Sequence, residues 1–439
     1  MKGRGYFKGE GLSFDLPDDW NLLAMAEPRE VAAVKDIEAE VKRALDDPIG
    51  MEPLSKIIPN LENKKTVILS EDQTRPTRVG LIALPLLNEL NRLGIPDEDI
   101  QVIIARGTHR HPMEDEVRDK LGEEVLKRVK ISVHDADDQD NLVLVGTTSR
   151  GTPCWTNRLV VEADLKIGIG TSNPHYFAGY EGGSKALLPG CSSFKTITTN
   201  HSRTLGNARV RELRIKGNDV REDMNEVSPL LERVKGIKHR ILDFVVNPDN
   251  SLAKAVYGKP PEAHTAIAEG YAKKVWAVEA EPASFVITVA DGPLGMNLYQ
   301  AFKAASFSVN IVTPKAENKP RVLVAAPLRD GIGSDAFAQE MERYAGWEPD
   351  NVIEDLKKRA ERLDITEASH KPNRLALDDR IAEFGFIAPN APSEVEELLS
   401  KTKYRFYRSL DEAIEDTPKG LLKNVAVIPY GSRTVPVPK

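Results

Sequence analysis

The chain has 439 residues, of which 41% are hydrophobic and 29% are charged, a composition typical of soluble globular proteins. Its length exceeds what one hydrophobic core usually serves, and it favours two domains of about 150–250 residues each. The 60 basic and 67 acidic residues give a net charge of −7 without a basic block, so neither a nucleic acid nor an anionic membrane is indicated as a partner.

Membrane insertion and disulfide bonding are also not indicated. No run of 18 apolar residues is present, and the first residues lack the apolar core of a signal peptide. The two cysteines, Cys154 and Cys191, are too few for a disulfide scaffold or a thiolate zinc site. These features predict a cytoplasmic protein.

Strand-like apolar runs alternate with helical patterns along most of the chain. Strands are predicted over residues 65–70, 100–105, 164–170, 241–246, 284–290, 321–327 and 424–429. Helices are predicted over residues 28–47, 76–93, 114–129, 219–234, 261–275 and 352–363. Short continuous apolar runs are typical of strands that are covered on both faces. The sequence therefore predicts an α/β fold with mostly parallel, helix-flanked sheets.

The domain boundary is predicted near residues 275–283, where a helix runs into Glu-Ala-Glu-Pro before the next strand. We expect an N-terminal α/β domain over residues 1–275 and a C-terminal α/β domain over residues 284–439. The strand at 424–429 can belong to either domain on the sequence alone.

Polar or glycine-containing loops directly follow five of the predicted strands. These loops are residues 71–77, 106–112, 171–175, 291–300 and 328–334. Ligands bind at the carboxyl edge of open parallel sheets, so the loops of each domain are expected to meet at such an edge. The two sets predict an active site in a cleft between the domains.

Two histidine-containing segments carry the side chains best suited to chemistry. His109 and His175 are candidate general acid and base residues, because imidazole exchanges a proton near neutral pH. Lys185 lies in a glycine-rich turn and is a candidate nucleophile or attachment point if its amine is desolvated. His201 is a candidate metal ligand.

Basic side chains and the remaining histidines have simpler interpretations. Arg75, Lys303 and Arg329 are suited to binding a carboxylate or a phosphate. Asp72 or Thr77 can instead cap the helix predicted to start at Pro76. His134 is expected in a solvated acidic loop. Structural roles are expected for His111, His239, His264 and His370.

Taken together, several separate motifs resemble the nickel-dependent lactate racemase family. They are residues 72–77 (Asp-Gln-Thr-Arg-Pro-Thr), 107–109, 174–180 (Pro-His-Tyr-Phe-Ala-Gly-Tyr), 182–185 (Gly-Gly-Ser-Lys), 188–190, 200–201, 299–300, 303 and 330–333. The resemblance covers most of the chain in the same order. It implies a racemase or epimerase that inverts C2 of a 2-hydroxy acid by reversible hydride transfer to a nickel pincer nucleotide.

The resemblance also implies roles for individual residues. Lys185 is the implied covalent attachment point of the cofactor and His201 the implied nickel ligand, with His109 and His175 as the two catalytic bases. The implied cofactor-binding residues are Asp72, Arg75, Gly182 and Gly183, and the implied substrate-binding residues are Arg75, Tyr299, Gln300 and Lys303. Enzymes of cofactor biosynthesis are implied partners.

Three positions depart from what the resemblance leads us to expect. Glu181 replaces a small residue, Ser184 stands where relatives carry another residue, and His111 is atypical. His111 can reach the polar tail of a substrate longer than lactate, so the hydroxy acid stays open.

Two other functions stay open from the residues alone. A metal-dependent hydrolase would use His109, His175 and His201 as ligands of one ion, but it gives Lys185 no role. A non-catalytic cofactor carrier would keep Lys185 and His201, but it needs neither of the two bases.

Overall fold

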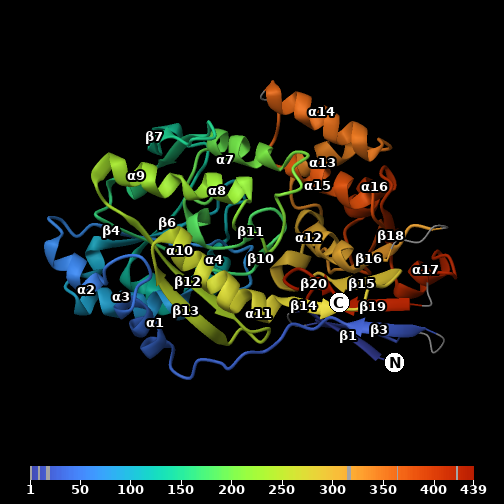
Figure 1. The fold of residues 1–439 in the computed structure, drawn as a ribbon, viewed down its shortest axis with the longest axis horizontal. Helices are drawn as coiled ribbons and strands as arrows, with labels where there is room; N and C mark the ends of the chain where they lie inside the picture. Colours follow the sequence, from blue (N-terminus) through green and yellow to red (C-terminus); the bar gives the residue numbers. More distant parts are fainter. Residues whose placement is uncertain (1, 8–9, 16–19, 314–317, 363, 422–423) are drawn as a thin grey trace. The chain divides into compact units, whose positions relative to one another are not determined.

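The computed structural model describes residues 2–7, 10–15, 20–313, 318–362, 364–421 and 424–439. The chain divides into two compact units (Figure 1). The first unit comprises Glu30–Arg203 and Arg209–Val275, and the second comprises Met1–Arg29, Thr204–Ala208 and Trp276–Lys439.

The first unit is built on a six-stranded sheet in the order β13-β12-β9-β4-β5-β6. Its strands are β4 (Thr66–Ser70), β5 (Ile100–Ile104), β6 (Lys130–Val133), β9 (Leu165–Thr171), β12 (His239–Val246) and β13 (Leu252–Gly258). All neighbours are parallel except β12 and β13. Apolar side chains on one face of this sheet form a core with helices α1 (Ile37–Asp46) and α3 (Gly80–Arg92).

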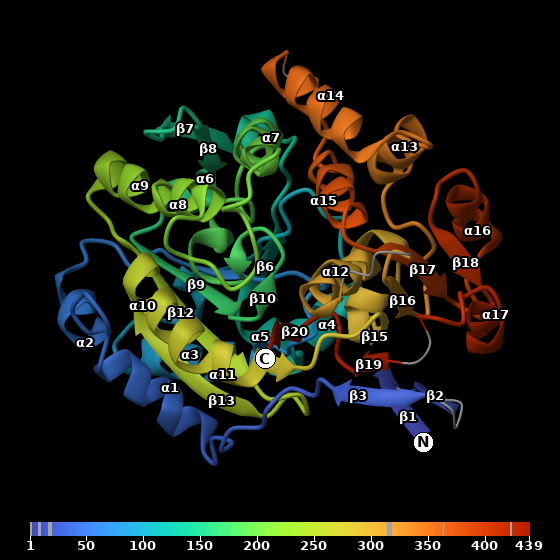
Figure 2. The ribbon, with the colours of Figure 1, turned by 45° about the vertical axis from the view of Figure 1, so that its right-hand side comes forward.

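On the opposite face of this sheet, a turn lies against β9. Gly168 and Gly170 of β9 lie on that face, and a Cβ at Gly170 would come within 2.9 Å of the Cα of Gly182. A Cβ at Gly168 would lie 3.1 Å from that of Ala186. The two glycines therefore let the turn around residues 182–186 lie directly on the sheet. Helix α10 (Pro260–Ile267) covers β12 and β13 beside this turn (Figure 2).

Shorter elements complete the first unit. They are α2 (Leu54–Ile57), α4 (Glu114–Leu121), α5 (Glu123–Arg128), β7 (Leu142–Thr147), β8 (Pro153–Asn157), α6 (Arg158–Glu162), β10 (Pro174–His175), β11 (Gly179–Tyr180), η4 (Gly183–Ala186), α7 (Phe194–His201), α8 (Asp219–Asn225), α9 (Val227–Lys235), η6 (Ala268–Ala272) and α11 (Lys273–Trp276). The β7–β8 and β10–β11 pairs are antiparallel hairpins.

The second unit contains a fully parallel sheet in the order β18-β17-β16-β15-β19-β3. Its strands are β3 (Asn21–Met25), β15 (Phe285–Val289), β16 (Arg321–Ala325), β17 (Glu383–Ile387), β18 (Arg405–Tyr407) and β19 (Asn424–Ile428). Its helices are α12 (Leu298–Ser308), α13 (Asp335–Arg343), α14 (Pro349–Glu361), α15 (His370–Asp379), α16 (Ser393–Ser400) and α17 (Leu410–Glu415). Two further pairs are β1 (Lys2–Phe7) with β2 (Glu10–Asp15), and β14 (Ala277–Ala280) with β20 (Val435–Pro438). Apolar cores cover both faces of the sheet.

The predicted α/β class with mostly parallel, helix-flanked sheets is confirmed, and all seven predicted strands are present. The chain passes from one compact unit to the other between Val275 and Trp276, and residues 1–29 group with the second unit, where β3 pairs with β19. The strand β19 also pairs with β15, so it belongs to the sheet of the second unit. The roles of the two predicted domains and the cleft between them stay predictions.

Two local predictions were wrong. The helix expected from Pro76 begins at Gly80, with neither Asp72 nor Thr77 as its cap. The amine of Lys120 instead donates hydrogen bonds to the carbonyls of Arg75 and Thr77, which holds residues 75–77 outside the helix. His134 was expected in solvent but is 1% exposed, because its ring is hydrogen-bonded to the carbonyl of Ser192.

No helix in the described ranges is long and apolar enough to cross a membrane.

Candidate active site

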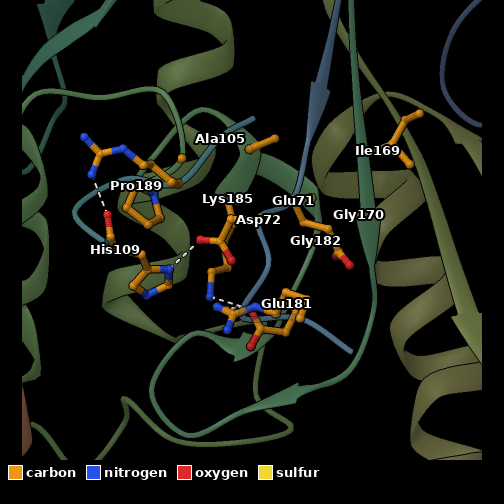
Figure 3. Close-up of a pocket in the computed structure, with 15 residues that line it drawn as sticks. Glu71, Asp72, Ala105, His109, Ile169, Gly170, Glu181, Gly182, Lys185 and Pro189 are labelled. Atoms are coloured by element: carbon orange, nitrogen blue, oxygen red, sulfur yellow. Dashed lines mark hydrogen bonds and ion pairs between the residues drawn. The ribbon is translucent and has the colours of Figure 1, made fainter. Parts of the chain in front are cut away.

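A buried carboxylate orients His109. Asp72 follows β4 and His109 follows β5, and Nδ1 of His109 lies 2.5 Å from Oδ2 of Asp72 (Figure 3). Thr74 donates to the other carboxylate oxygen from its backbone N–H and its hydroxyl. Although burial by itself raises the pKa of Asp72, the nearby His109, Arg75 and Thr74 outweigh it and hold this pKa well below the usual value. Because the ionised Asp72 accepts a hydrogen bond from Nδ1–H, the neutral ring of His109 has its basic lone pair on Nε2.

The hydrogen bonds of His175 favour the other tautomer of the imidazole ring. It lies in β10, where its Nδ1 accepts a hydrogen bond from the backbone N–H of Ala178 at 3.1 Å, with Phe177 N–H at 3.4 Å. An accepting Nδ1 places the proton of the neutral ring on Nε2. In the neutral state His109 therefore presents a base and His175 an acid.

Lys185 lies in the short η4 turn, and its side chain is 9% exposed. Its amine donates to Oε2 of Glu181 at 2.8 Å. Burial lowers the pKa of this amine to about 7, although the charge of Glu181 opposes the effect. Burial thus favours the neutral form of the amine, which is the form that a nucleophilic lysine requires.

The buried side chains of Asp243, His264 and Arg221 stabilise the turn that contains Lys185. Asp243 of β12 accepts hydrogen bonds from the N–H of Gly183 at 2.8 Å and from Nδ1 of His264 at 2.7 Å. Arg221 of α8 donates to the carbonyls of Ala178 and Gly182, at 2.9 and 3.0 Å. These contacts satisfy backbone groups that a buried turn would otherwise leave unpaired.

The glycines of the turn are required at these positions. Gly182 and Gly183 have φ angles of +73° and +65°. A Cβ at Gly182 would lie 2.9 Å from Oδ2 of Asp243, and one at Gly183 would lie 2.7 Å from the ring of His264. The backbone N–H of Gly183 also donates a hydrogen bond to Asp243, which helps to hold the turn in this conformation.

His201 is the last residue of α7, and its side chain is buried. Burial lowers the pKa of its imidazole to about 3, with further contributions from the charges of Lys185 and His109. The ring is therefore neutral at physiological pH, as a metal-ligating imidazole must be.

The ring of Phe177 lies close to three of the predicted site residues. Its ring centroid lies 4.3 Å from that of His175, 5.0 Å from that of His201 and 5.9 Å from the amine of Lys185. Lys185 and His109 line a pocket of about 60 Å³ that opens to solvent. Its lining residues are Glu71, Asp72, Arg75, Ala105, Arg106, His109, Ile169, Gly170, Glu181, Gly182, Gly183, Lys185, Ala186, Pro189 and Gly190.

Several of these supporting residues were not identified from the sequence. Phe177, Arg221 and Asp243 were not singled out, and His264 was assigned only a structural role. One signal was available for Asp243, which is the single acidic residue within the apolar run 241–246. Arg221 gives no such signal, because its partners are backbone carbonyls far away in the sequence.

The predicted substrate-binding residues Tyr299, Gln300 and Lys303 lie on α12 in the second unit. Gln300 and Lys303 are 9% and 3% exposed. The amine of Lys371 lies 4.6 Å from the ring centroid of Tyr299. Arg329, the third predicted basic side chain, is exposed on the same unit. Their roles stay predictions.

A three-histidine hydrolase site is not formed in the described part of the chain. No group of three or more His, Cys, Asp or Glu side chains is placed there to hold one metal ion.

Several known proteins are similar to this chain. The profile of the lactate racemase N-terminal domain matches residues 7–212. A lactate racemase from Thermoanaerobacterium thermosaccharolyticum is 32% identical over 331 residues, which are 74% of each chain. The chain belongs to the lactate racemase family. It is accordingly an isomerase, of the racemase type.

A second lactate racemase and two solved structures are also similar to this chain. A lactate racemase from Lactiplantibacillus plantarum is 31% identical over 301 residues, 68% of each chain. The structure of the lactate racemase apoprotein from Thermoanaerobacterium thermosaccharolyticum matches 99% of this chain and 100% of its own, with a TM-score of 0.85 and 26% identity. A crystal structure of a Thermotoga maritima protein, with a TM-score of 0.68 and 17% identity, shares the fold.

Proposed function

We propose that this chain inverts C2 of a 2-hydroxy acid, either lactate or a larger acid, with a nickel pincer nucleotide attached covalently to Lys185. One observation carries the proposal. In a chain of the lactate racemase family, a buried lysine and a buried neutral histidine, His201, gather around Phe177 together with His175. His109 lines the same pocket as Lys185.

The residues of the pocket suit this cofactor. A lysine amine with a pKa of about 7 can be acylated, and a buried neutral imidazole is a good nickel ligand. Asp72, Arg75, Gly182 and Gly183 would shape and charge the surroundings of the cofactor. When bound, the cofactor supplies a reversible hydride acceptor, which is needed because the C2 hydrogen of a hydroxy acid is not acidic enough for histidine to remove.

The two histidines would handle the proton of the substrate hydroxyl. Nε2 of His109, which carries the lone pair while Asp72 holds Nδ1, takes this proton in one direction. Nε2–H of His175 donates a proton to the oxygen when the opposite enantiomer forms, and the roles exchange in the reverse reaction. Arg75, Tyr299, Gln300 and Lys303 would bind the carboxylate and orient the substrate.

The cellular setting follows from the same proposal. The chain would depend on enzymes of cofactor biosynthesis as partners and would act in the cytoplasm, which suits two buried unpaired cysteines.

The decisive experiment is intact-protein mass spectrometry with nickel analysis, on protein co-expressed with pincer-nucleotide biosynthesis enzymes. We expect a mass adduct on Lys185 and one nickel per chain. Lys185→Ala should lose both, whereas Lys254→Ala, a lysine paired with Glu40, should keep both. No adduct under conditions that load another family member would refute the proposal.

Variants of the bases separate an enzyme from a carrier. His109→Ala and His175→Ala should keep the adduct and the nickel but stop racemisation. Racemisation is measured by chiral chromatography of lactate and larger 2-hydroxy acids. Racemisation that continues unchanged in both variants would remove the two histidines from the mechanism.

A further inference from the structure

Glu181 lies at the centre of the charged network in the pocket. Its side chain is 4% exposed, and its Oε2 lies 2.8 Å from the amine of Lys185 and 3.1 Å from Nη2 of Arg75. Its Oε1 lies 3.9 Å from Nε2 of His175. Figure 3 shows the carboxylate of Glu181 beside the amine of Lys185.

A carboxylate at this depth is costly unless cations compensate it. Removing an ionised group from water costs several kcal/mol, and only close opposite charges with hydrogen bonds offset this cost. Glu181 has two such cations within 3.1 Å. The arrangement is thus a specific three-membered ion cluster.

The resemblance described above leads us to expect a small residue at position 181, where this chain has Glu181. A small side chain would leave the amine of Lys185 near Arg75 and Arg221, whose charges both disfavour protonation of the amine. Glu181 reverses that electrostatic environment. The four-residue spacing from Lys185 crosses the two glycines, so the tight turn is what brings the carboxylate to the amine.

We propose that Glu181 is the counter-ion and positioning residue of Lys185, and that its carboxylate holds the protonated amine in an ion pair that must open before the cofactor can be attached. This inference rests on the proposed attachment at Lys185. It goes beyond that function because it assigns control of the amine to a residue outside the family motif. Glu181 touches the lysine and orients it.

The test measures the reactivity of the amine itself. The full chain is expressed without biosynthesis enzymes and treated with acetic anhydride between pH 5 and 9. Acetylation of Lys185 is then followed by peptide mass spectrometry. Wild type, Glu181→Gln and Glu181→Ser are compared. The matched control is Glu40→Gln, because Glu40 is also a partly buried carboxylate paired with one arginine and one lysine, in the same unit but on α1.

Losing the carboxylate should make the amine neutral at lower pH. We expect the acetylation rate of Lys185 at pH 6 to rise in both Glu181 variants, by about tenfold for each unit by which the pKa falls. Glu40→Gln should match wild type. Glu181→Ser guards against misfolding of the glutamine variant, because it restores a residue of the expected size.

Two results would overturn the inference. One is an unchanged pH profile of Lys185 in both Glu181 variants, and the other is an equal shift in Glu40→Gln. Neither depends on cofactor loading. A wild-type chain that never carries the adduct would instead refute the proposed attachment and leave the effect of Glu181 on the amine measurable.

Discussion

Nδ1 of His109 and Oδ2 of Asp72 are 2.5 Å apart, whereas Nδ1 of His175 accepts from backbone N–H groups. The Nδ1 atoms of the two histidines thus have different partners: an ionised carboxylate for His109 and neutral peptide groups for His175. A carboxylate stabilises the protonated imidazole, and backbone donors do not. This asymmetry gives the first prediction.

Asp72→Asn should lower kcat at least about 100-fold, because asparagine cannot stabilise the imidazolium of His109 and its amide can favour the wrong tautomer. The adduct on Lys185 should remain, as judged by intact mass. Asp135→Asn is the control, since Asp135 is an exposed carboxylate paired with Arg106 at 3.4 Å. Equal kcat values for wild type and Asp72→Asn would show that this carboxylate has no part in the reaction.

His201→Ala should separate metal binding from covalent attachment. The neutral imidazole is the proposed nickel ligand, while the adduct depends on Lys185, so nickel should fall and the adduct mass should stay. Elemental analysis and intact mass on the same sample give both values. Nickel retained at the wild-type stoichiometry would remove His201 from the coordination of the metal.

Gly170→Ala should destabilise the first unit by about 1–3 kcal/mol, because the added methyl group would meet Gly182 at 2.9 Å. Urea unfolding measures the cost, and the adduct should decrease as the turn is displaced. Gly270→Ala is the matched control: Gly270 lies in the helical η6 segment, and an added Cβ has no atom within 4 Å. Alanine there should be neutral or stabilise by up to about 1 kcal/mol. Similar unfolding curves for the two variants would contradict the close packing of turn and sheet.

His239 should make stability fall with acidification. Burial lowers the pKa of its imidazole from 6.5 to about 3, with smaller contributions from Lys166 and Arg240. Between these values the unfolded chain binds a proton that the folded chain does not, so stability is fully present above pH 6.5 and decreases as pH falls towards 3. The slope is about 1.4 kcal/mol per pH unit for one such group.

His239→Leu should reduce that slope by the contribution of one group, measured as urea unfolding at pH 7, 6 and 5. Neither ring nitrogen has a hydrogen-bond partner among the described residues, so the substitution removes no such bond. Parallel pH dependences in wild type and variant would mean that His239 is protonated in the folded chain.

Much of this protein was predictable from its sequence because the signals are local. Apolar runs such as 241–246 fix strand positions, and alternation with helical segments fixes the α/β class. Gly182, Gly183 and Lys185 stand within four residues, so their motif is visible in the sequence. The start of α3 was mispredicted because Lys120, more than forty residues away, binds the carbonyls that precede the helix.

The sequence by itself determined the fold class, the family and the histidines and lysine to which we assign the proposed chemistry. Only the tertiary structure decided how those groups are charged. The opposite tautomers of His109 and His175, the lowered pKa values of Lys185 and His201, and the ion cluster of Glu181 all arise from burial and from partners distant in sequence. Charge and proton position depend on what surrounds a side chain in three dimensions, which residue type and spacing along the chain do not specify.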